Sequence, residues 1–287
     1  MNLLIFTIVL FVLFPFLFGT LAVFLFGRKN KTLGSIGLLF HSISDVPAMH
    51  CSYYSCIKFE TLICRLRGEG FRFLTVSQIA QSPDYNRRNS IVMTFDDGFE
   101  TFYSNALPLC ERHGIKTTVF PVAGFLGKSS SWDALPQQSH LTKNQIIEIS
   151  SLGHEIGSHT LTHANLTLLP KNELYKELSE SKKILEDILG KPVKSISFPF
   201  GRVDERVWNA AKDVGYTFAT SYVLKGKKID GILPLWGAYS YDSVQDIIER
   251  AVRQPFLSHT LARGRLMPHF AKGSPLWKFR STYKIVV

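Results

Sequence analysis

Residues 91–100 read Ile-Val-Met-Thr-Phe-Asp-Asp-Gly-Phe-Glu, and this stretch decides the fold of the chain. It begins as an apolar, β-branched run, which is typical of a strand buried on both faces. It ends in two adjacent carboxylates, Asp96 and Asp97, although charged side chains are rarely buried without a partner. Because successive strand side chains point to opposite faces, both acids can serve one site only if the strand ends there, and Gly98 gives the backbone that freedom. An ordinary turn is the alternative, since Asp and Gly both favour turns.

The segments around this strand alternate between helix-like and strand-like patterns. Apolar residues at helical spacing predict helices over 59–70, 102–113, 142–152, 172–189 and 205–214. Strand-like runs occupy 36–40, 117–122, 155–159, 195–198 and 216–221. This alternation predicts βαβ units with parallel strands. Several polar groups follow the strands directly, where α/β barrels keep their active sites.

Two histidines, His159 and His163, stand four residues apart, which places them on one face if the segment is helical. Together with Asp97 they make a two-histidine, one-carboxylate set that leaves positions open on a metal, as catalytic zinc sites require. The same set binds ferrous iron in oxygenases, so the residues themselves leave the metal open. Ordinary buried polar groups are the plainer interpretation of such histidines.

These residues resemble the motifs of the polysaccharide deacetylase family, the NodB-homology domain. Thr94–Gly98 looks like its first motif, His159–His163 resembles its second, His-[Ser/Thr]-x-x-His, and Phe198–Gly201 is similar to its third. The resemblance spans about residues 36–242. The family's last motif, Leu-x-His, normally lies near the C-terminus.

Here Leu39-Phe40-His41 fits the Leu-x-His motif at the other end of the domain, on the first strand. Some members that act on poly-N-acetylglucosamine are circularly permuted in this way. In a closed barrel the first and last strands are neighbours, so such a permutation keeps the geometry. A buried strand-end histidine bonded to the backbone is the alternative for His41.

The resemblance implies a distorted (β/α) barrel of the NodB-homology type and a metal-dependent carbohydrate N-deacetylase, an amide hydrolase. The implied metal ligands are Asp97, His159 and His163. Zinc is the expected divalent metal, with iron, cobalt and nickel left open.

Asp96 would be the general base, and His41 would donate a proton to the departing amine. Pro199 and Phe200 would contribute to the oxyanion and substrate site through the backbone N–H near Phe200.

Three positions depart from the family pattern. Ser197 stands where the third motif carries arginine, Leu235 stands where another arginine is expected, and Phe200 replaces the usual tyrosine. An aspartate base without a cationic neighbour is stronger but less readily ionised. Besides the N-deacetylase, the sequence therefore leaves a catalytically weak or inert homologue that serves as a glycan-binding or assembly subunit. An iron oxygenase built on the same triad is the third interpretation.

Residues 1–27 are predicted to form a single transmembrane anchor. Leu3–Phe26 is almost unbroken apolar sequence and would reach about 36 Å as a helix, against about 30 Å of hydrocarbon core. A cleavable signal peptide is the alternative, although no basic n-region or small-x-small cleavage site is clear. Arg28, Lys29 and Lys31 follow the run, and the positive-inside tendency then places the domain in the cytoplasm. An extracytoplasmic domain is the alternative, because members of the family are often exported.

The rest of the chain divides into a linker over 28–35, a catalytic domain over 36–250 and a basic tail over 251–287. From Arg250 onward there are eight Lys or Arg residues and no Asp or Glu, interleaved with aromatic residues, in a chain of net charge +10. On an anchored protein these favour anionic membrane lipids over nucleic acid as the partner, and a solvated tail is the alternative. Four cysteines are too few and too scattered for a disulfide framework or a zinc ribbon.

His41 follows Phe26 by only fifteen residues, a tether of about 50 Å even when fully extended. The active site is therefore expected close to the bilayer. The expected substrate is an N-acetylated glycan that is membrane-associated, either a lipid-linked N-acetylhexosamine or a nascent polysaccharide.

Overall fold

The computed structural model describes residues 36–46, 52–82, 89–129, 138–222 and 229–253. The chain divides into two units, Met1–Leu33 and Gly34–Val287, and the described residues belong to the second. The expected anchor, the linker and the basic tail from residue 254 lie outside them. Among the described residues, none of the helices has the length and apolar character needed to cross a bilayer.

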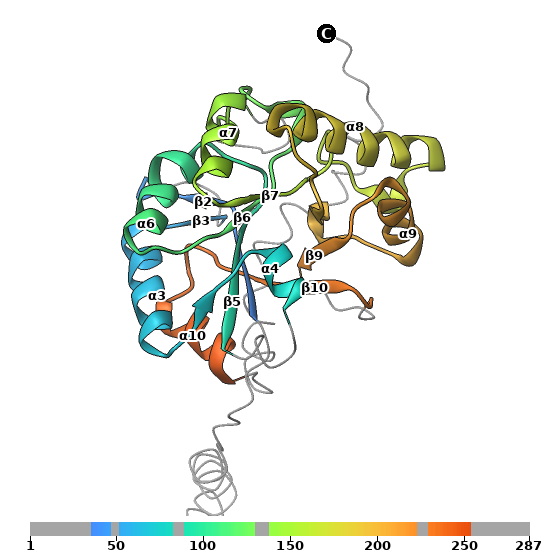
Figure 1. Cartoon of the computed structure of the whole chain (residues 1–287). Coiled ribbons are helices and arrows are strands. Elements are labelled where there is room, and N and C mark those ends of the chain that lie inside the picture. The colour runs from blue at the N-terminus through green and yellow to red at the C-terminus, as the bar shows by residue number, and fades with distance from the viewer. Residues whose placement is uncertain (1–35, 47–51, 83–88, 130–137, 223–228, 254–287) are drawn as a thin grey trace, which may run out of the picture. The chain divides into compact units, whose positions relative to one another are not determined.

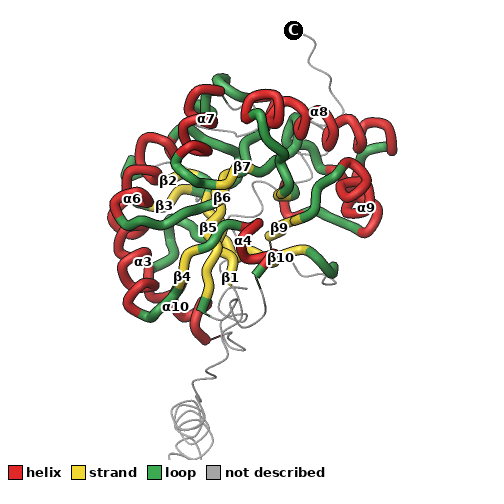
Figure 2. The backbone as a smooth tube through the Cα atoms, viewed as in Figure 1, coloured by secondary structure: helices red, strands yellow, loops and turns green. Residues whose placement is uncertain are grey.

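The described domain is built on a parallel sheet of eight strands, ordered β7-β6-β5-β1-β10-β9-β8 with β4 paired to β5. The strands are β1 (Ile36–Phe40), β4 (Arg72–Phe73), β5 (Ser90–Phe95), β6 (Thr118–Val119), β7 (Glu155–Ile156), β8 (Ser195–Ser197), β9 (Phe218–Tyr222) and β10 (Ile232–Gly237). A parallel bridge between Ser158 and Ile196 joins the two ends of this order, so the sheet is a nearly closed barrel (Figure 2). The barrel expected from the sequence is confirmed.

Helices surround the strands (Figure 1). They are α3 (Cys56–Gly68), α6 (Leu107–Arg112), α7 (Lys143–Ser151), α8 (Lys171–Leu189), α9 (Glu205–Val214) and α10 (Val244–Arg253). Short elements complete the domain: α4 (Val76–Gln81), a π-helical turn η2 (Phe102–Ala106), the 3₁₀ turns η3 (Ala123–Phe125), η4 (Leu166–Leu168) and η5 (Pro199–Gly201), and a strand pair β2 (Ser42–Ile43) and β3 (Tyr53–Tyr54). The five helices predicted from periodicity are all present, the second as η2 followed by α6.

Local sequence explains where the principal helices begin and end. α7 begins with a capping box in which Thr142 and Gln145 satisfy each other's backbone N–H groups. α8 ends at Gly190 in the left-handed conformation, φ 63°, as a glycine after a helix allows. These caps supply partners for some of the backbone groups that a helix end leaves unpaired, so the local sequence marks both ends.

The side chains of β5 alternate between the helices and the barrel interior. Phe95 packs against Phe40 of β1 and Phe59 of α3, with ring centroids 5.4 and 5.7 Å away, so it faces outward. Val92 packs inward against α4 and Phe120 in a buried apolar cluster. Because strand side chains alternate, Asp96 continues the inward-facing series that includes Val92.

Several elements of the domain were not expected from sequence: the short strands β2, β3 and β4, the short helix α4, and β10 and α10 near the end of the domain. The strand β10 contains Pro234, and α10 crosses the boundary expected at residue 250, because the helix continues to Arg253. The thiols of Cys56, Cys64 and Cys110 are free, as expected, while Cys51 lies outside the described residues.

Candidate metal and catalytic site

The two carboxylates Asp96 and Asp97 follow β5 directly and are almost completely buried, 4% and 1% exposed. Asp97 and Gly98 both have left-handed backbone, with φ of 68° and 70°, so the chain turns as soon as the strand ends. A side chain at Gly98 would lie 2.6 Å from Cα of Pro121, which excludes any larger residue without a shift of the backbone. The tight turn is what aims both acids at one region.

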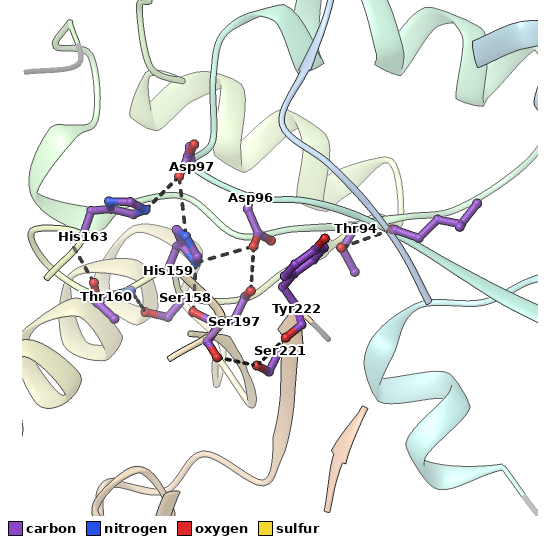
Figure 3. A network of polar contacts seen from close by, with 12 residues as sticks. Thr94, Asp96, Asp97, Ser158, His159, Thr160, His163, Ser197, Ser221 and Tyr222 are labelled. Atoms are coloured by element: carbon purple, nitrogen blue, oxygen red, sulfur yellow. Dashed lines mark hydrogen bonds and ion pairs between the residues drawn. The ribbon is translucent and has the colours of Figure 1, made fainter. Parts of the chain in front are cut away.

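Asp97 meets His159 and His163 in one cluster (Figure 3). The Nε2 atoms of the two histidines lie 3.5 and 3.3 Å from Oδ1 of Asp97, and one ligand atom from each residue falls within 4.8 Å of the others. Atoms that share a tetrahedral zinc at about 2.0–2.1 Å lie about 3.3 Å apart, so this spacing fits a divalent cation. All three side chains are buried.

The histidine segment is an irregular loop, so the helix considered for the four-residue spacing is not formed. Two of its residues, Thr160 and His163, have left-handed backbone with φ of 68° and 62°, which is uncommon outside glycine. Within the loop the Thr160 hydroxyl accepts a hydrogen bond from the His163 N–H at 3.1 Å. The loop therefore places the two rings side by side, with centroids 5.0 Å apart.

A backbone carbonyl fixes the tautomer of His159. Its Nδ1 lies 2.8 Å from the carbonyl oxygen of Ser197, and since a carbonyl can only accept, Nδ1 carries the proton. The unprotonated Nε2 then faces Asp97, as a metal ligand requires. Complete burial lowers the pKa of His159, which favours the neutral imidazole over the charged one.

Asp96 lies beside the cluster of candidate metal ligands and has a different partner. Its Oδ2 accepts a hydrogen bond of 2.8 Å from the Ser197 hydroxyl and lies 3.9 Å from Nδ1 of His159. At the position of the expected arginine the protein thus supplies a neutral donor. The second expected arginine is Leu235, whose side chain is fully buried against Gly37 of the neighbouring strand.

His41 follows β1 on the strand beside β5. The pairing of Phe40 with Phe95 sets His41 level with Asp96, and the Asp96 N–H donates to the Phe40 carbonyl at 3.0 Å. By strand alternation His41 continues on the inward face, opposite to Phe40. Because β1 pairs with β10 as well as β5, the first strand is the neighbour of the last.

Pro199 and Phe200 form η5, the turn after β8. Phe200 has left-handed backbone with φ of 60°, and its ring packs edge-on against His163 with centroids 4.7 Å apart. Pro199 is buried. The phenyl ring of Phe200 therefore covers one side of a candidate metal ligand.

One residue that sequence reasoning did not single out is Glu177 of α8, whose carboxylate contacts the histidine loop. Its position carries a signal. α8 buries Leu174, Leu178, Ser181 and Leu185 on one face, and Glu177 falls on that face. An acid among the core positions of an amphipathic helix needs a specific partner.

Comparison with known proteins agrees with the motifs. Residues 84–219 match the sequence profile of the polysaccharide deacetylase family. YxkH of Bacillus subtilis, assigned to the polysaccharide deacetylases, is 30% identical over 182 residues, which cover 62% of this chain and 61% of YxkH. The chain thus spans less than two thirds of that relative. A poly-β-1,6-N-acetyl-D-glucosamine N-deacetylase of Staphylococcus aureus is 25% identical over 203 residues, 68% of each chain. A polysaccharide deacetylase structure from Bacillus cereus shares the fold, with a TM-score of 0.64, 24% identity and coverage of 76% of this chain and 69% of that one.

Proposed function

We propose that this chain, whose residues 84–219 match the polysaccharide deacetylase family, is a metal-dependent hydrolase that removes N-acetyl groups from N-acetylhexosamine units of a glycan. One observation carries the proposal. Asp97, His159 and His163 converge with ligand-like spacing, and a separate carboxylate, Asp96, lies beside them. A cation site with an adjacent acid that does not belong to the ligand set is the arrangement that metal-assisted amide hydrolysis needs.

The residues present fit a divalent cation, zinc in the first instance. Asp97 and the Nε2 atoms of His159 and His163 would hold it. When bound, such a cation supplies a nucleophile at neutral pH and polarises the acetamide carbonyl. The three protein ligands leave room for both of these roles, as catalytic zinc sites do.

Asp96 is the proposed proton acceptor. Its carboxylate is buried beside the candidate metal ligands and is oriented by the Ser197 hydroxyl at 2.8 Å, which suits a base that takes a proton from the attacking water. His41 is the proposed proton donor to the departing amine, because an amine leaves poorly without a proton. The register of β1 and β5 supports this role, since it sets His41 level with Asp96 on the adjacent strand.

The backbone N–H near Phe200 is the proposed partner of the oxyanion. The left-handed conformation of Phe200 turns the backbone sharply after Pro199, beside the His163 ring. A backbone N–H held in that way stabilises developing negative charge without needing the hydroxyl of the usual tyrosine.

The proposed substrate is membrane-associated or lipid-linked. The apolar run at residues 3–26 and the short tether to His41 support a site near a bilayer, and the basic C-terminal residues support contact with anionic lipid. We propose a single-pass anchor with the domain on the cytoplasmic side. The staphylococcal relative is named for poly-β-1,6-N-acetyl-D-glucosamine, which supports a β-linked N-acetylglucosamine substrate class here.

A second candidate function is a weakly active or inert subunit that binds glycan. The observation that favours it is the loss of both expected arginines: Ser197 and Leu235 stand at their positions, and the Leu235 side chain is fully buried. Loss of the arginine lowers the rate strongly only if the general base depends on that arginine. Here the Ser197 hydroxyl contacts Asp96 in its place.

Acetate release separates these functions. Wild type, Asp96→Asn and His159→Ala would be incubated with a lipid-linked N-acetylglucosamine, soluble β-1,6-linked N-acetylglucosamine oligomers and chitooligomers, with and without chelator. The deacetylase proposal expects release by wild type alone, sensitivity to chelator and recovery with zinc. Binding of glycan without acetate release would establish the second function. Preference for long soluble polymer over the lipid-linked sugar would overturn the membrane-linked substrate.

A further inference from the structure

The loop that carries both candidate histidine ligands is held from outside the site by one acid on α8. Glu177 is buried, 8% exposed, and its Oε2 accepts hydrogen bonds from the N–H groups of Leu161 and Thr162 at 3.0 and 2.9 Å. Its Oε1 accepts from the Thr162 hydroxyl at 2.5 Å. Three donors from two consecutive loop residues therefore converge on one carboxylate.

The same loop is held on its other side by backbone. The N–H groups of Ala123 and Gly124 donate to the carbonyls of Thr160 and Leu161 at 3.0 and 2.8 Å. This approach is so close that a side chain at Gly124 would lie 2.5 Å from the Leu161 carbonyl oxygen. Leu161 is thus fixed through its carbonyl by the η3 turn and through its N–H by Glu177.

This bracing is needed because the loop conformation is strained. Thr160 and His163 both have left-handed backbone, a conformation that non-glycine residues keep only when the surroundings determine it. Residues 161 and 162 lie between these two, so the donors bound by Glu177 are at the centre of the strained segment. Hydrogen bonds to a carboxylate are stronger than those to a neutral acceptor, which suits this task.

We propose that Glu177 is a positioning residue for metal binding: it holds residues 160–163 in the conformation that brings Nε2 of His163 to 3.3 Å from Asp97. The inference rests on the metal-dependent function proposed above. Without the carboxylate, the loop relaxes toward ordinary backbone angles and His163 leaves the cluster, while His159 remains fixed by the Ser197 carbonyl. The expected consequence is a weaker and differently coordinated metal.

The test measures metal binding directly by competition of Zn²⁺ against a chromophoric chelator, in the full chain at a temperature well below unfolding. Glu177→Ala is expected to weaken zinc affinity about 10- to 100-fold, the usual effect of removing a residue that orients a ligand. Glu177→Gln keeps one oxygen that accepts the two N–H groups and is expected to lose less. Glu180→Ala, on an exposed position of the same helix, is the matched control and is expected to bind zinc as wild type does.

Co²⁺ substitution gives a readout that a general loss of stability does not move. The visible bands of bound cobalt report ligand number and geometry, so Glu177→Ala is expected to change their position or intensity and Glu180→Ala is not. Wild-type affinity and an unchanged cobalt spectrum in Glu177→Ala would overturn the positioning role alone. If wild type itself binds no metal, or binds it equally after Asp97→Asn, the proposed function fails and the positioning role fails with it.

Discussion

Ser197 donates its hydroxyl hydrogen to Asp96, with 2.8 Å between Oγ and Oδ2, in a buried setting. The carbonyl of the same residue accepts Nδ1–H of His159 at 2.8 Å. A single residue at the end of β8 therefore orients both the proposed base and one proposed metal ligand, through its side chain and its backbone respectively. The residue that departs from the family pattern is in this way integrated into the site.

Ser197→Ala should lower acetate release and change its pH dependence. The substitution removes the hydroxyl donor from Asp96 but leaves the carbonyl that holds His159. A buried carboxylate that loses a donor to its charged form is harder to ionise, so the acid limb of the kcat/KM profile should move to higher pH. We expect about a 10-fold loss at neutral pH, the value of about one hydrogen bond to a charged group.

Ser197→Thr is the control, because it keeps the hydroxyl and should retain the wild-type profile. Metal content should stay the same in both variants. An unchanged acid limb in Ser197→Ala would show that the Ser197 hydroxyl does not tune the base.

Zinc should stabilise the folded chain through Asp97, His159 and His163. A ligand present at 100 times its Kd adds about 2.7 kcal/mol to the free energy of unfolding, and a shift of about 5–10 °C in Tm follows for a domain of this size. Thermal unfolding of chelator-treated protein with and without added zinc measures it. His163→Ala should abolish the shift.

His113→Ala is a suitable control for this experiment, since His113 pairs with Glu60 away from the cluster. It should leave the zinc-dependent shift intact. A shift of equal size in His163→Ala would mean that zinc binds somewhere else.

Much of the site could be predicted from sequence because its candidate reactive residues lie in short contiguous motifs. Asp96, Asp97, His159 and His163 sit directly after strands, and parallel strands bring their ends to one edge of a barrel. The backbone conformations that join them could not be read from residue types. Left-handed angles at Asp97, Thr160 and His163 depend on contacts from distant segments, such as η3 and α8. The histidine spacing considered for a helix belongs to a loop for this reason.

The fold was predictable where periodicity was strong and not where strands were short or interrupted. β6 and β7 pair over two residues each, so their bounds are set by the neighbouring strands and not by their own sequences. β10 carries a proline, which ordinarily argues against a paired strand, yet Pro234 is exposed and the strand pairs with β1 and β9. Tertiary pairing overrode local preference at that strand.

The stability of the metal-free protein should fall as pH drops from about 7 to 5. Burial lowers the pKa of both His154 and His159 from the ordinary value of 6.5, so the unfolded chain takes up protons before the folded one does. A group with a depressed pKa makes the folded state lose stability as pH falls below the unfolded pKa. Urea unfolding in chelator at pH 7.5, 6.5 and 5.5 should show a decreasing free energy of unfolding.

The contributions of the two histidines can be separated at His154, because it bonds to Thr117 and Glu111 and not to the candidate metal ligands. Its Nδ1 accepts from the Thr117 N–H at 3.2 Å and its Nε2 donates to Glu111 at 2.9 Å. His154→Gln removes one of the two titrating groups, so its stability should depend less steeply on pH than that of wild type. A slope equal to that of wild type would show that burial does not lower the pKa of His154 in the folded protein.

Gly98→Ala should damage the turn that aims the two carboxylates. Gly98 has φ of 70°, and an added Cβ would lie 2.6 Å from Cα of Pro121, a backbone atom in the segment that follows β6. Gly114→Ala is the matched control, because Gly114 has φ of 60° but open space around the added Cβ.

Both variants carry the left-handed strain of about 1 kcal/mol, and only Gly98→Ala adds the collision, which typically costs about 1–3 kcal/mol more. Urea unfolding should therefore rank wild type above Gly114→Ala and Gly114→Ala above Gly98→Ala. Zinc affinity should fall only in Gly98→Ala, since the shifted turn carries Asp97, and equal losses in the two variants would show that strain alone, and not the contact with Pro121, fixes the turn.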